Sequence, residues 1–396
     1  MTTIEKFPGV RSEPFLPAAE YERWRKEGPL RRVRLDNGQD TWVVLRHNEA
    51  EEILAQTESL SSDATAPGFP QFRAGAASGT ATTQLVRMNP PLHGQYRKIL
   101  ATFFTAKKIA SCKPEIQRFT EDAIHSMLER GPPADFHEEV ALVIPSNAIC
   151  LLLGVDYSLH TEFERLSRPV ASALVSAEVR NTAITDLYKL MAEIFDAQRT
   201  HPREGVISRL IELVDKGEMP YEAALSNAFL ILLGGHETTA HSISLGVVQM
   251  LQRPDLMRAV RDDPSKMPAL VEEMLRTQSI AETVMVRAVT KPICVGQQVI
   301  EPGEGITVPA SCPNHDPAAF ANPHEIDLER GLGEGHLAFG GGIHSCLGQT
   351  LARTEMMIAF DAVIRLIPTL RLDESAEIEY QRDPFLFGVR RLPVTW

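Results

Sequence analysis

The sequence predicts a mainly helical fold with small β-sheets, of the α+β class, in a single domain over residues 1–396. Helical periodicity runs through most of residues 91–278. Strand-rich segments lie on both sides of this helical middle, and no low-complexity linker or internal repeat separates them. This distribution favours one mixed domain, with a short N-terminal tail at about residues 1–15, over two tandem domains.

The N-terminal part of the chain predicts a hairpin, a short helix and a long loop, in that order. LRRVRL and TWVVL, within residues 30–45, flank Asn37-Gly38, which is a strong signal for a two-residue hairpin turn. A helix is expected at about 48–56. Residues 60–82 are rich in Ser, Ala, Gly and Thr and include Phe69 and Phe72, so we expect a long loop of the kind that often carries function.

The remaining elements follow from changes in periodicity. Helical period is clear in the stretches 158–175, 183–199, 221–252 and 347–366. Between residues 283 and 312 the pieces VMVRAV, KPICVG and GITVPA are β-rich and are punctuated by Pro302-Gly303. Residues 313–345 have little periodicity and many Pro and Gly residues, and the end of the chain, PFLFGVRRLPVTW, predicts a terminal hairpin.

Charge and hydropathy exclude several classes of partner. The chain has 52 acidic and 40 basic residues and a formal net charge of −12, which argues against nucleic acid. The N-terminus lacks the apolar core of a secretory signal. The longest apolar stretch, at about 223–233, is shorter than the ~20 residues that a membrane span needs. We therefore expect a cytoplasmic protein without a membrane anchor.

The cysteines do not form a disulfide pattern. There are five, an odd number without CxxC spacing, which argues against a disulfide framework and fits a reducing compartment: Cys112, Cys150, Cys294, Cys312 and Cys346. Each is then either a small core residue or a reactive thiol.

The strongest signal is a glycine cluster before Cys346. In HLAFGGGIHSCLGQTLAR, Gly340, Gly341 and Gly342 precede Cys346, and a helix is expected just after it. Glycine lacks Cβ and so lets the backbone approach a flat ligand closely. The N–H groups at a helix N-terminus favour the thiolate form of a nearby cysteine. A phosphate-binding glycine loop does not fit, because no GxxxxGK[ST] pattern follows and a βαβ context is missing.

A second signal interrupts the apolar helix at 221–252. Gly234 and Gly235 stand side by side, and each glycine costs a helix interior roughly 1 kcal/mol relative to Ala. An acid and a hydroxyl, Glu237 and Thr238, follow at once. The combination predicts a local opening of the helix where a small ligand can bind.

The cysteine loop resembles the haem-binding signature of the cytochrome P450 family, position for position, at Phe339, Gly340, Gly342, His344, Cys346 and Gly348. The resemblance covers about residues 20–396 and implies the cytochrome P450 fold, a single triangular domain, with haem b (iron protoporphyrin IX) as cofactor. It implies that Cys346 is the axial ligand of the iron, whose thiolate favours O–O cleavage. Phe339 would pack beside the sulfur, and His344 would lie near a haem propionate.

The LLGGHETT segment resembles the family's central-helix motif, [AG]-G-x-[DE]-T. The resemblance implies that Gly235 makes room for O2 and that Glu237 and Thr238 relay protons to it. Cleavage of the O–O bond requires two protons, so a carboxylate and a hydroxyl at this place make chemical sense. Thr239 is expected to be structural.

Two further motifs imply contacts that hold the haem and its loop. PPLHGQYR resembles the family's [DN]PPxHxxxR, so His93 and Arg97, on one helix face, would hold a propionate, and Arg287 matches a third propionate partner. The alternative for each is a solvated surface charge. The chain departs from the family in carrying Asn89 where Asp is commoner and His315 where Arg is commoner.

Glu273-x-x-Arg276, on its own an ordinary i,i+3 ion pair, resembles the family's ExxR motif. Arg330, in DLER, matches the later arginine that pairs with it. The resemblance implies a structural triad that locks the loop carrying Cys346, with a role in folding rather than in chemistry.

The resemblance is greatest to soluble bacterial members of class I type. It implies a haem-thiolate monooxygenase that hydroxylates or epoxidises a small to medium apolar substrate, in secondary metabolism. Electrons would come from a separate ferredoxin with its reductase, or from a flavodoxin, and Lys98, Lys107, Lys108 and Arg353 are candidate docking contacts. We expect a monomer that binds neither nucleic acid nor membrane.

Two alternatives remain open at this stage. One is a haem-thiolate peroxygenase or nitric oxide reductase, because GFPQF and the segment from Glu273 to Ile306 resemble the fungal nitric oxide reductase branch. Those enzymes lack the acid of the central-helix motif, so Glu237 argues against them. The other is a gas sensor or carrier, for which a signalling domain would be expected.

The family's pocket positions fall on residues that predict an apolar pocket: Phe69, Phe72, Leu232, Leu233, Gly234, Ile280, Thr283, Val284, Phe385, Leu386 and Phe387. Plain core packing is the alternative for each. Arg73 is a candidate partner for a substrate carboxylate. Terpenoid, macrolide, steroid and aromatic substrates all remain open.

Overall fold

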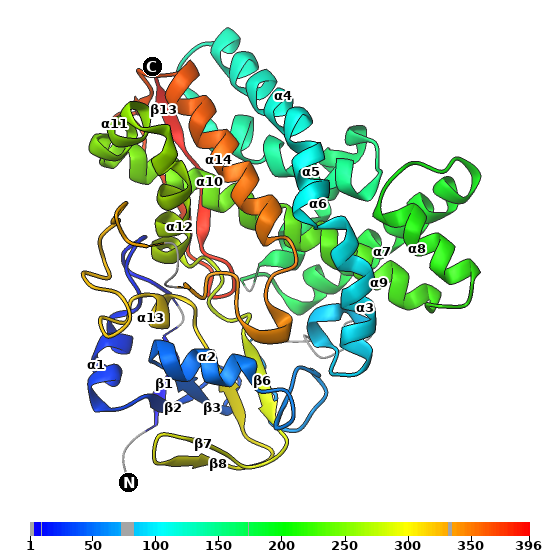
Figure 1. Ribbon diagram of the computed structural model, residues 1–396, viewed down its shortest axis with the longest axis vertical. Helices are drawn as coiled ribbons and strands as arrows, with labels where there is room; N and C mark the ends of the chain where they lie inside the picture. The colour runs from blue at the N-terminus through cyan, green and yellow to red at the C-terminus, as the bar shows by residue number, and fades with distance from the viewer. Residues whose placement is uncertain (1–3, 9, 73–82, 173, 332–334) are drawn as a thin grey trace. The chain divides into compact units, whose positions relative to one another are not determined.

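The computed structural model describes residues 4–8, 10–72, 83–172, 174–331 and 335–396 (Figure 1). The chain divides into two compact units, each assembled from three separate stretches of sequence. The first unit comprises Met1–Tyr96, Glu272–Cys346 and Arg382–Phe387, and the second comprises Arg97–Val271, Leu347–Gln381 and Gly388–Trp396. The single domain over residues 1–396 stays a prediction beside this division.

The first unit holds the largest sheet and a few short helices. Its helices are α1 (Ala19–Glu27), α2 (His47–Ala55) and α13 (Ser311–Asn314), with the 3-10 turns η2 (Leu85–Arg87) and η7 (Gly342–His344). Its strands are β1 (Glu5–Lys6), β2 (Leu30–Arg34), β3 (Asp40–Val44), β4 (Leu60–Ser61), β6 (Val286–Val289), β7 (Ile293–Val295), β8 (Gln298–Ile300) and β9 (Gly305–Thr307). The sheet has the order β1-β2-β3-β9-β6-β4, while β7 and β8 form a separate hairpin.

Helix α2 packs against one face of this sheet. Its apolar residues Ala50, Ile53 and Leu54 are buried in one cluster with Val44 of β3 and Ile306 of β9. The spacing of these three helix residues puts them on one side of α2, so that the helix covers the sheet and presents its C-terminal turn to the loop before Cys346.

The predicted hairpin at 30–45 is present, but its turn is one residue longer than expected. Strands β2 and β3 pair antiparallel, and the pairing continues to a hydrogen bond from the N–H of Leu35 to the carbonyl of Gln39. Three residues therefore form the turn, with Gly38 in the left-handed region at φ +85°. This is the common three-residue solution, in which the glycine ends a turn that the right-handed strand twist tolerates.

The second unit is mainly helical. Its helices are α4 (Ala106–Arg130), α5 (Val143–Leu153), α6 (His160–Ala171), α7 (Ala177–Thr200), α8 (Val206–Asp215), α9 (Tyr221–Gly235), α10 (Glu237–Gln252), α11 (Pro254–Asp262) and α14 (Gln349–Leu366). Shorter helical turns are η3 (Ala101–Phe103), the π-turn η4 (His137–Ala141), η5 (Tyr157–Leu159) and η6 (Pro264–Lys266). Its strands are β5 (Ala134–Asp135), β10 (Arg371–Leu372), β11 (Glu379–Gln381), β12 (Gly388–Arg391) and β13 (Pro393–Thr395). Helices α3 (Leu92–Leu100) and α12 (Met267–Gln278) each cross a boundary between the units.

The core of the second unit is organised around α10. This helix is buried along almost its whole length and contacts α5, α9 and α14. A helix that is buried all round belongs in the centre of a large helical unit. The mainly helical class with small sheets is therefore confirmed, and α6, α7 and α14 lie close to the stretches where helical periodicity placed them.

The predicted terminal hairpin is wrong. Strand β12 pairs with β11, whereas β13 pairs with β10 and β5, so the two consecutive strands belong to different sheets. Only Leu392 lies between them, and a hairpin needs a longer connection. The N–H of Leu392 donates instead to the Asp135 carboxylate at 2.9 Å, and its carbonyl accepts from Phe136 at 2.9 Å.

Within the part of the chain that the structure describes, no helix combines the length and the apolar composition that crossing a membrane requires.

Candidate functional site

The glycine loop folds back on itself to present Cys346. The N–H of Gly340 donates to the carbonyl of Leu337 at 3.0 Å, and the N–H of Cys346 donates to the carbonyl of Phe339 at 2.8 Å. The thiol of Cys346 is exposed at the end of this loop. The loop therefore holds one sulfur at its surface through its own backbone hydrogen bonds.

Two glycines of this loop have conformations that other residues rarely adopt. Gly340 has φ +69° and Gly342 has φ +62°, both in the left-handed region. A Cβ on Gly342 would also collide with the backbone carbonyl of Leu54 in α2. Glycine is thus required at 342 by conformation and by space, and the loop lies directly against the end of α2.

The sulfur lies close in sequence to the start of a long helix. Gly348 is the N-cap residue of α14, which begins at Gln349, three positions after Cys346. Gly348 has no side chain that could cap this helix end, and the first N–H groups of a helix have no partner within the helix itself. Such an end stabilises a thiolate in its vicinity.

His93 and His344 come together beside this loop. Their ring centroids are 4.2 Å apart, His93 is buried, and the hydroxyl of Ser62 lies 3.0 Å from Nε2 of His344. Asn89 fixes the backbone there, because its Oδ1 accepts from the N–H of Ser62 at 2.9 Å and its Nδ2 donates to Ser61 at 2.7 Å. Asn89, which stands where aspartate is commoner in the family, uses both ends of its amide in these two contacts.

Two arginines of the first unit, the buried Arg287 and the half-buried Arg87, lack a carboxylate partner among the described residues. Arg287 donates to the carbonyl of Val286 at 2.7 Å, and the Nη1 atom of Arg87 is buried with no hydrogen-bond partner among those residues. Burial lowers the pKa of each guanidinium to about 10, and the charge of Arg87 lowers that of Arg287 further. Residues 73–82 contain no aspartate or glutamate either.

Two desolvated cations with no carboxylate partner in the part of the chain that the structure describes are suited to a ligand that brings carboxylates. The two propionates of a haem fit this need, and they also fit the neighbouring imidazoles of His93 and His344. Arg287 was predicted in this role, whereas Arg87 was not. The only signal in the sequence for Arg87 is that an arginine stands among apolar residues just before the PP motif. This signal indicates a binding role only once the side chain is known to be buried.

The predicted triad is assembled. Both oxygens of the Glu273 carboxylate accept from Arg276, at 2.7 and 2.8 Å, and Arg330 lies 3.0 Å from Oε1. Arg276 is 1% exposed and also donates to the carbonyls of Asn314, Pro323 and Glu325. The group therefore fastens α12 to the irregular segment that leads toward the cysteine loop.

The long apolar helix is interrupted where the sequence predicted an opening. Helix α9 ends at Gly235 and α10 begins at Glu237, with His236 between them. The Thr238 hydroxyl donates to the carbonyl of Gly234 at 2.7 Å, so it satisfies an oxygen at the end of α9. Glu237 is buried beside it.

His236 was not predicted as a site residue, yet it anchors this break. Its imidazole is buried and lies 3.7 Å from the Glu164 carboxylate of α6, which accepts from the Ser146 hydroxyl of α5 at 3.0 Å. Burial raises the pKa of Glu164, but the neighbouring His236 and the hydrogen bond from Ser146 more than offset this and hold the pKa below its usual value. The break is thus tied to two neighbouring helices.

A buried acid adjoins the same helix. Burial raises the pKa of Glu355, in α14, well above its usual range, and the side chain of Thr239 interacts with it. Burial therefore favours the neutral form of this carboxyl. Neither residue pattern nor spacing signals this group, because an acid on a helix is normally solvated.

The residues predicted for the substrate pocket divide between the units. In the first unit Phe69 is buried, and Thr283 and Phe387 lie in two segments that pair with each other. In the second unit Leu232 is buried, Leu233 is half-buried and Gly234 is exposed. Among the other predicted residues, Arg97 is half-buried in the second unit, and Phe72 makes an edge contact with Phe7 at 4.8 Å. Arg73 lies outside the described residues.

The comparisons with known proteins agree on one family. The model of the family described as cytochrome P450 matches residues 163–367. Pentalenic acid synthase of Streptomyces avermitilis is 38% identical, over 98% of this chain and 97% of the relative. Vitamin D3 dihydroxylase of Streptomyces griseolus is 36% identical, over 100% and 98%. The structure of the mycinamicin VIII C21 methyl hydroxylase MycCI of Micromonospora griseorubida, bound to mycinamicin VIII, matches with a TM-score of 0.93 at 28% identity, covering 99% of this chain and 100% of that one.

Proposed function

Since the chain belongs to the cytochrome P450 family and is a haem-thiolate monooxygenase that uses O2, a redox partner and an organic substrate, we propose roles for its residues and a class of substrate. Haem bound through a thiolate supplies the oxygen chemistry, because electron donation from sulfur to iron favours cleavage of the O–O bond.

Cys346 is the thiolate ligand in this proposal. The observation that carries it is the glycine loop, which holds an exposed thiol at its end through the hydrogen bond between Cys346 and Phe339. The N-terminus of α14, which begins three residues after Cys346, favours the deprotonated sulfur that an iron ligand requires. Phe339 and Gly340 shape the surface beside the sulfur.

Basic groups bind the propionates. His93, Arg97, Arg287 and His344 take this role from the family, and Arg87 joins them because its buried guanidinium needs an anion. Charge-assisted hydrogen bonds from arginine to carboxylate are strong and directional, so they orient the ligand as well as retain it. The bound group is haem b, the form that has two free propionates and no covalent link to the protein.

Glu237 and Thr238 hold and move protons. Glu237 is buried at the start of α10, and the Thr238 hydroxyl is oriented by the carbonyl of Gly234. A carboxylate that takes up protons and a hydroxyl that passes them on are suited to the reduction of O2, which consumes protons. The interaction between His236 and Glu164 keeps the backbone of this segment in place.

The substrate is a mainly apolar secondary metabolite that undergoes hydroxylation. Support comes from relatives named for pentalenic acid, vitamin D3 and mycinamicin VIII. Electrons come from a separate ferredoxin with its reductase, or from a flavodoxin, and the enzyme acts as a monomer in the cytoplasm. None of the five cysteines forms a disulfide, which fits a reducing compartment.

The ligand assignment is tested with carbon monoxide. The reduced protein is expected to give the red-shifted Soret band of a thiolate-bound haem. Cys346→His should retain haem but lose both this band and oxygenase activity, since imidazole replaces the sulfur. Cys294→Ser, at the other exposed cysteine, is the matched control and should behave as the wild type. An unchanged band in Cys346→His would exclude Cys346 as the ligand.

The substrate class is tested by spin-state titration of the ferric protein with terpenoid, steroid, macrolide and small aromatic compounds. A blue shift of the Soret band marks a compound that displaces water from the iron. No shift with any of these compounds would contradict a free apolar substrate.

A further inference from the structure

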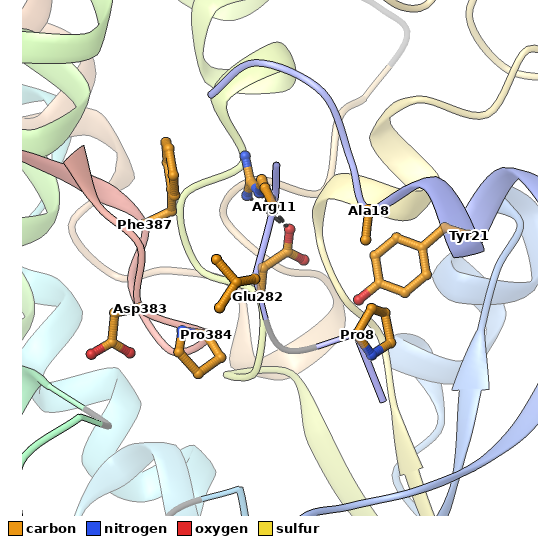
Figure 2. Close-up of a pocket in the computed structure, with 9 residues that line it drawn as sticks. Pro8, Arg11, Ala18, Tyr21, Glu282, Asp383, Pro384 and Phe387 are labelled. Atoms are coloured by element: carbon orange, nitrogen blue, oxygen red, sulfur yellow. Dashed lines mark hydrogen bonds and ion pairs between the residues drawn. The ribbon is translucent and has the colours of Figure 1, made fainter. Parts of the chain in front are cut away.

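A buried ion pair joins the N-terminal segment to the segment after α12. Arg11 is 4% exposed and Glu282 is 7% exposed. Nε of Arg11 donates to Oε1 of Glu282 at 3.0 Å, and Nη2 lies 2.8 Å from the same oxygen. Figure 2 shows the two side chains meeting between Phe387 and Tyr21.

The same guanidinium caps helix α12. Arg11 also donates to the backbone carbonyls of Gln278 and Ser279, at the point where α12 ends. Carbonyls at a helix C-terminus have no partner within the helix, and a cation is favoured there. Ser279 has φ +40°, a conformation that non-glycine residues rarely adopt. Arg11 therefore fixes the direction in which the chain leaves α12.

Arg11 also contacts the segment near the C-terminus. Its guanidinium lies 5.1 Å from the centre of the Phe387 ring, and its backbone carbonyl accepts from Arg382 at 2.9 Å. The two segments that it touches are joined to each other as well. The N–H of Phe387 donates to the carbonyl of Ile280 at 2.8 Å, and Thr283 donates to Pro384 at 3.2 Å.

Stability alone does not explain such a pair. Removing two charges from water costs several kcal/mol per ion, and apolar residues of similar volume often serve the fold as well or better. The Arg11 guanidinium does, however, hold residues 278–282 through one carboxylate and two carbonyls, and with its contacts to Phe387 and Arg382 it fixes three chain segments in one relative geometry. The pair thus fixes the relative positions of these segments, whereas an apolar contact would allow them to shift against one another.

We propose that the Arg11–Glu282 pair positions the walls of the substrate pocket and so determines which substrates the enzyme accepts and where it oxidises them. Residues 283 and 284 on one segment and 387 on the other are the pocket residues that the pair holds in place. The inference rests on the proposed function in one respect, namely that these residues face the substrate. Arg11 is a positioning residue and takes no part in the chemistry.

The test compares variants of the full-length holoenzyme. In Arg11→Met/Glu282→Met the pair is replaced by apolar side chains, which should preserve folding. Arg11→Lys keeps the charge but cannot reach all three acceptors. The matched control is Lys26→Gln/Glu22→Gln, which removes an exposed ion pair of α1 in the same unit.

Four compounds, a terpenoid, a steroid, a macrolide and a small aromatic, are titrated by spin state, and the products of the tightest-binding one are analysed. Both Arg11 variants should keep the thiolate band with carbon monoxide, yet change at least one dissociation constant by roughly tenfold, about 1.4 kcal/mol, and alter the ratio of products. The control should match the wild type.

Wild-type affinities and product ratios in both variants would overturn the proposal. If the double variant does not fold, Arg11→Lys decides by the same readouts. A wild-type enzyme without the thiolate band, or without any spin-state response, would instead overturn the proposed function, and the positioning role with it.

Discussion

At the scale of single residues, the informative groups are those whose burial is out of keeping with their charge. Arg87 is the clearest example. Its Nη1 atom is buried without a hydrogen-bond partner among the described residues, and its guanidinium makes a cation–π contact with the ring of Phe69 at 4.9 Å. A guanidinium in such a place costs free energy unless an anion accompanies it. We infer that the haem carboxylates relieve this cost.

Arg87→Met is therefore expected to weaken retention of the haem. Loss of a charge-assisted hydrogen bond is worth about 1.5–3 kcal/mol, so transfer of haem to an apomyoglobin acceptor should be about tenfold faster or more. Stopped-flow absorbance measures the rate without any need for turnover. Arg118→Met, at an exposed arginine of α4, is the control and should leave the rate unchanged. A wild-type transfer rate in Arg87→Met would remove Arg87 from the propionate site.

The residues that the sequence could identify are those in contiguous motifs. Phe339 to Gly348 is one short run, so its residue types and spacing carry the prediction without reference to the fold. Arg87, His236 and Glu355 were missed for the opposite reason. Each is an ordinary polar residue in the sequence, and its role depends on burial and partners that come from distant segments.

At the scale of elements, the break between α9 and α10 shows how two adjacent glycines can have different tasks. A Cβ on Gly235 would lie 2.7 Å from Cδ1 of Ile149 in α5, whereas nothing lies within 4 Å of one on Gly234. Gly235 thus permits close packing of α9 on α5, and Gly234 is needed for no such contact.

Gly235→Ala should lower the free energy of unfolding by about 1–3 kcal/mol, because the added methyl overpacks against Ile149. Gly234→Ala should instead be neutral or stabilising by up to about 1 kcal/mol, as expected when alanine replaces glycine in a helix. Urea unfolding followed by circular dichroism measures both. Ile149→Val in the Gly235→Ala background should recover part of the loss. Equal effects of the two alanines would contradict this assignment.

Local periodicity was a good guide to helices and a poor one to strand partners. Helices α6, α7 and α14 follow from the pattern of apolar residues along one stretch. The pairing of β3 with β9, and the separation of β12 from β13, depend on segments far apart in the sequence. The turn predicted at Asn37-Gly38 was one residue shorter than the turn in the structure for a related reason. The pairing of Leu35 with Gln39 is set by the strands rather than by the turn residues.

At the scale of the whole molecule, three buried histidines make stability depend on pH. Burial lowers the pKa of His241 and of His315 to about 3, and that of His137 well below its usual value. In the unfolded chain each has a pKa near 6.5. Below that value the unfolded state binds protons that the folded state does not, so stability falls as the pH falls toward 3.

Glu355 acts in the opposite direction. Its raised pKa means that the folded state holds a proton above pH 4.5 that the unfolded state has lost, so its contribution declines as the pH rises. Between about pH 5 and 6 three histidines act against this one acid, so stability should fall on acidification.

Urea unfolding of the holoenzyme at several pH values between about 5 and 7 tests this slope. His315→Asn removes one of the titrating groups while keeping a donor for the carbonyl of Ser311, so its slope should be less steep than that of the wild type. A slope of the opposite sign would mean that these imidazoles are protonated in the folded protein.

The contacts of Arg11 also bear on the order in which this protein is made. A residue from the first dozen is bound to the end of α12 and to residues 382–387, the last stretch of the first unit. The ribosome releases the N-terminus first. Arg11 therefore cannot contact both the end of α12 and residues 382–387 until nearly all of these 396 residues have been synthesised. Until then the partly made polypeptide exposes apolar surface, and we expect it to be a client of chaperones during synthesis.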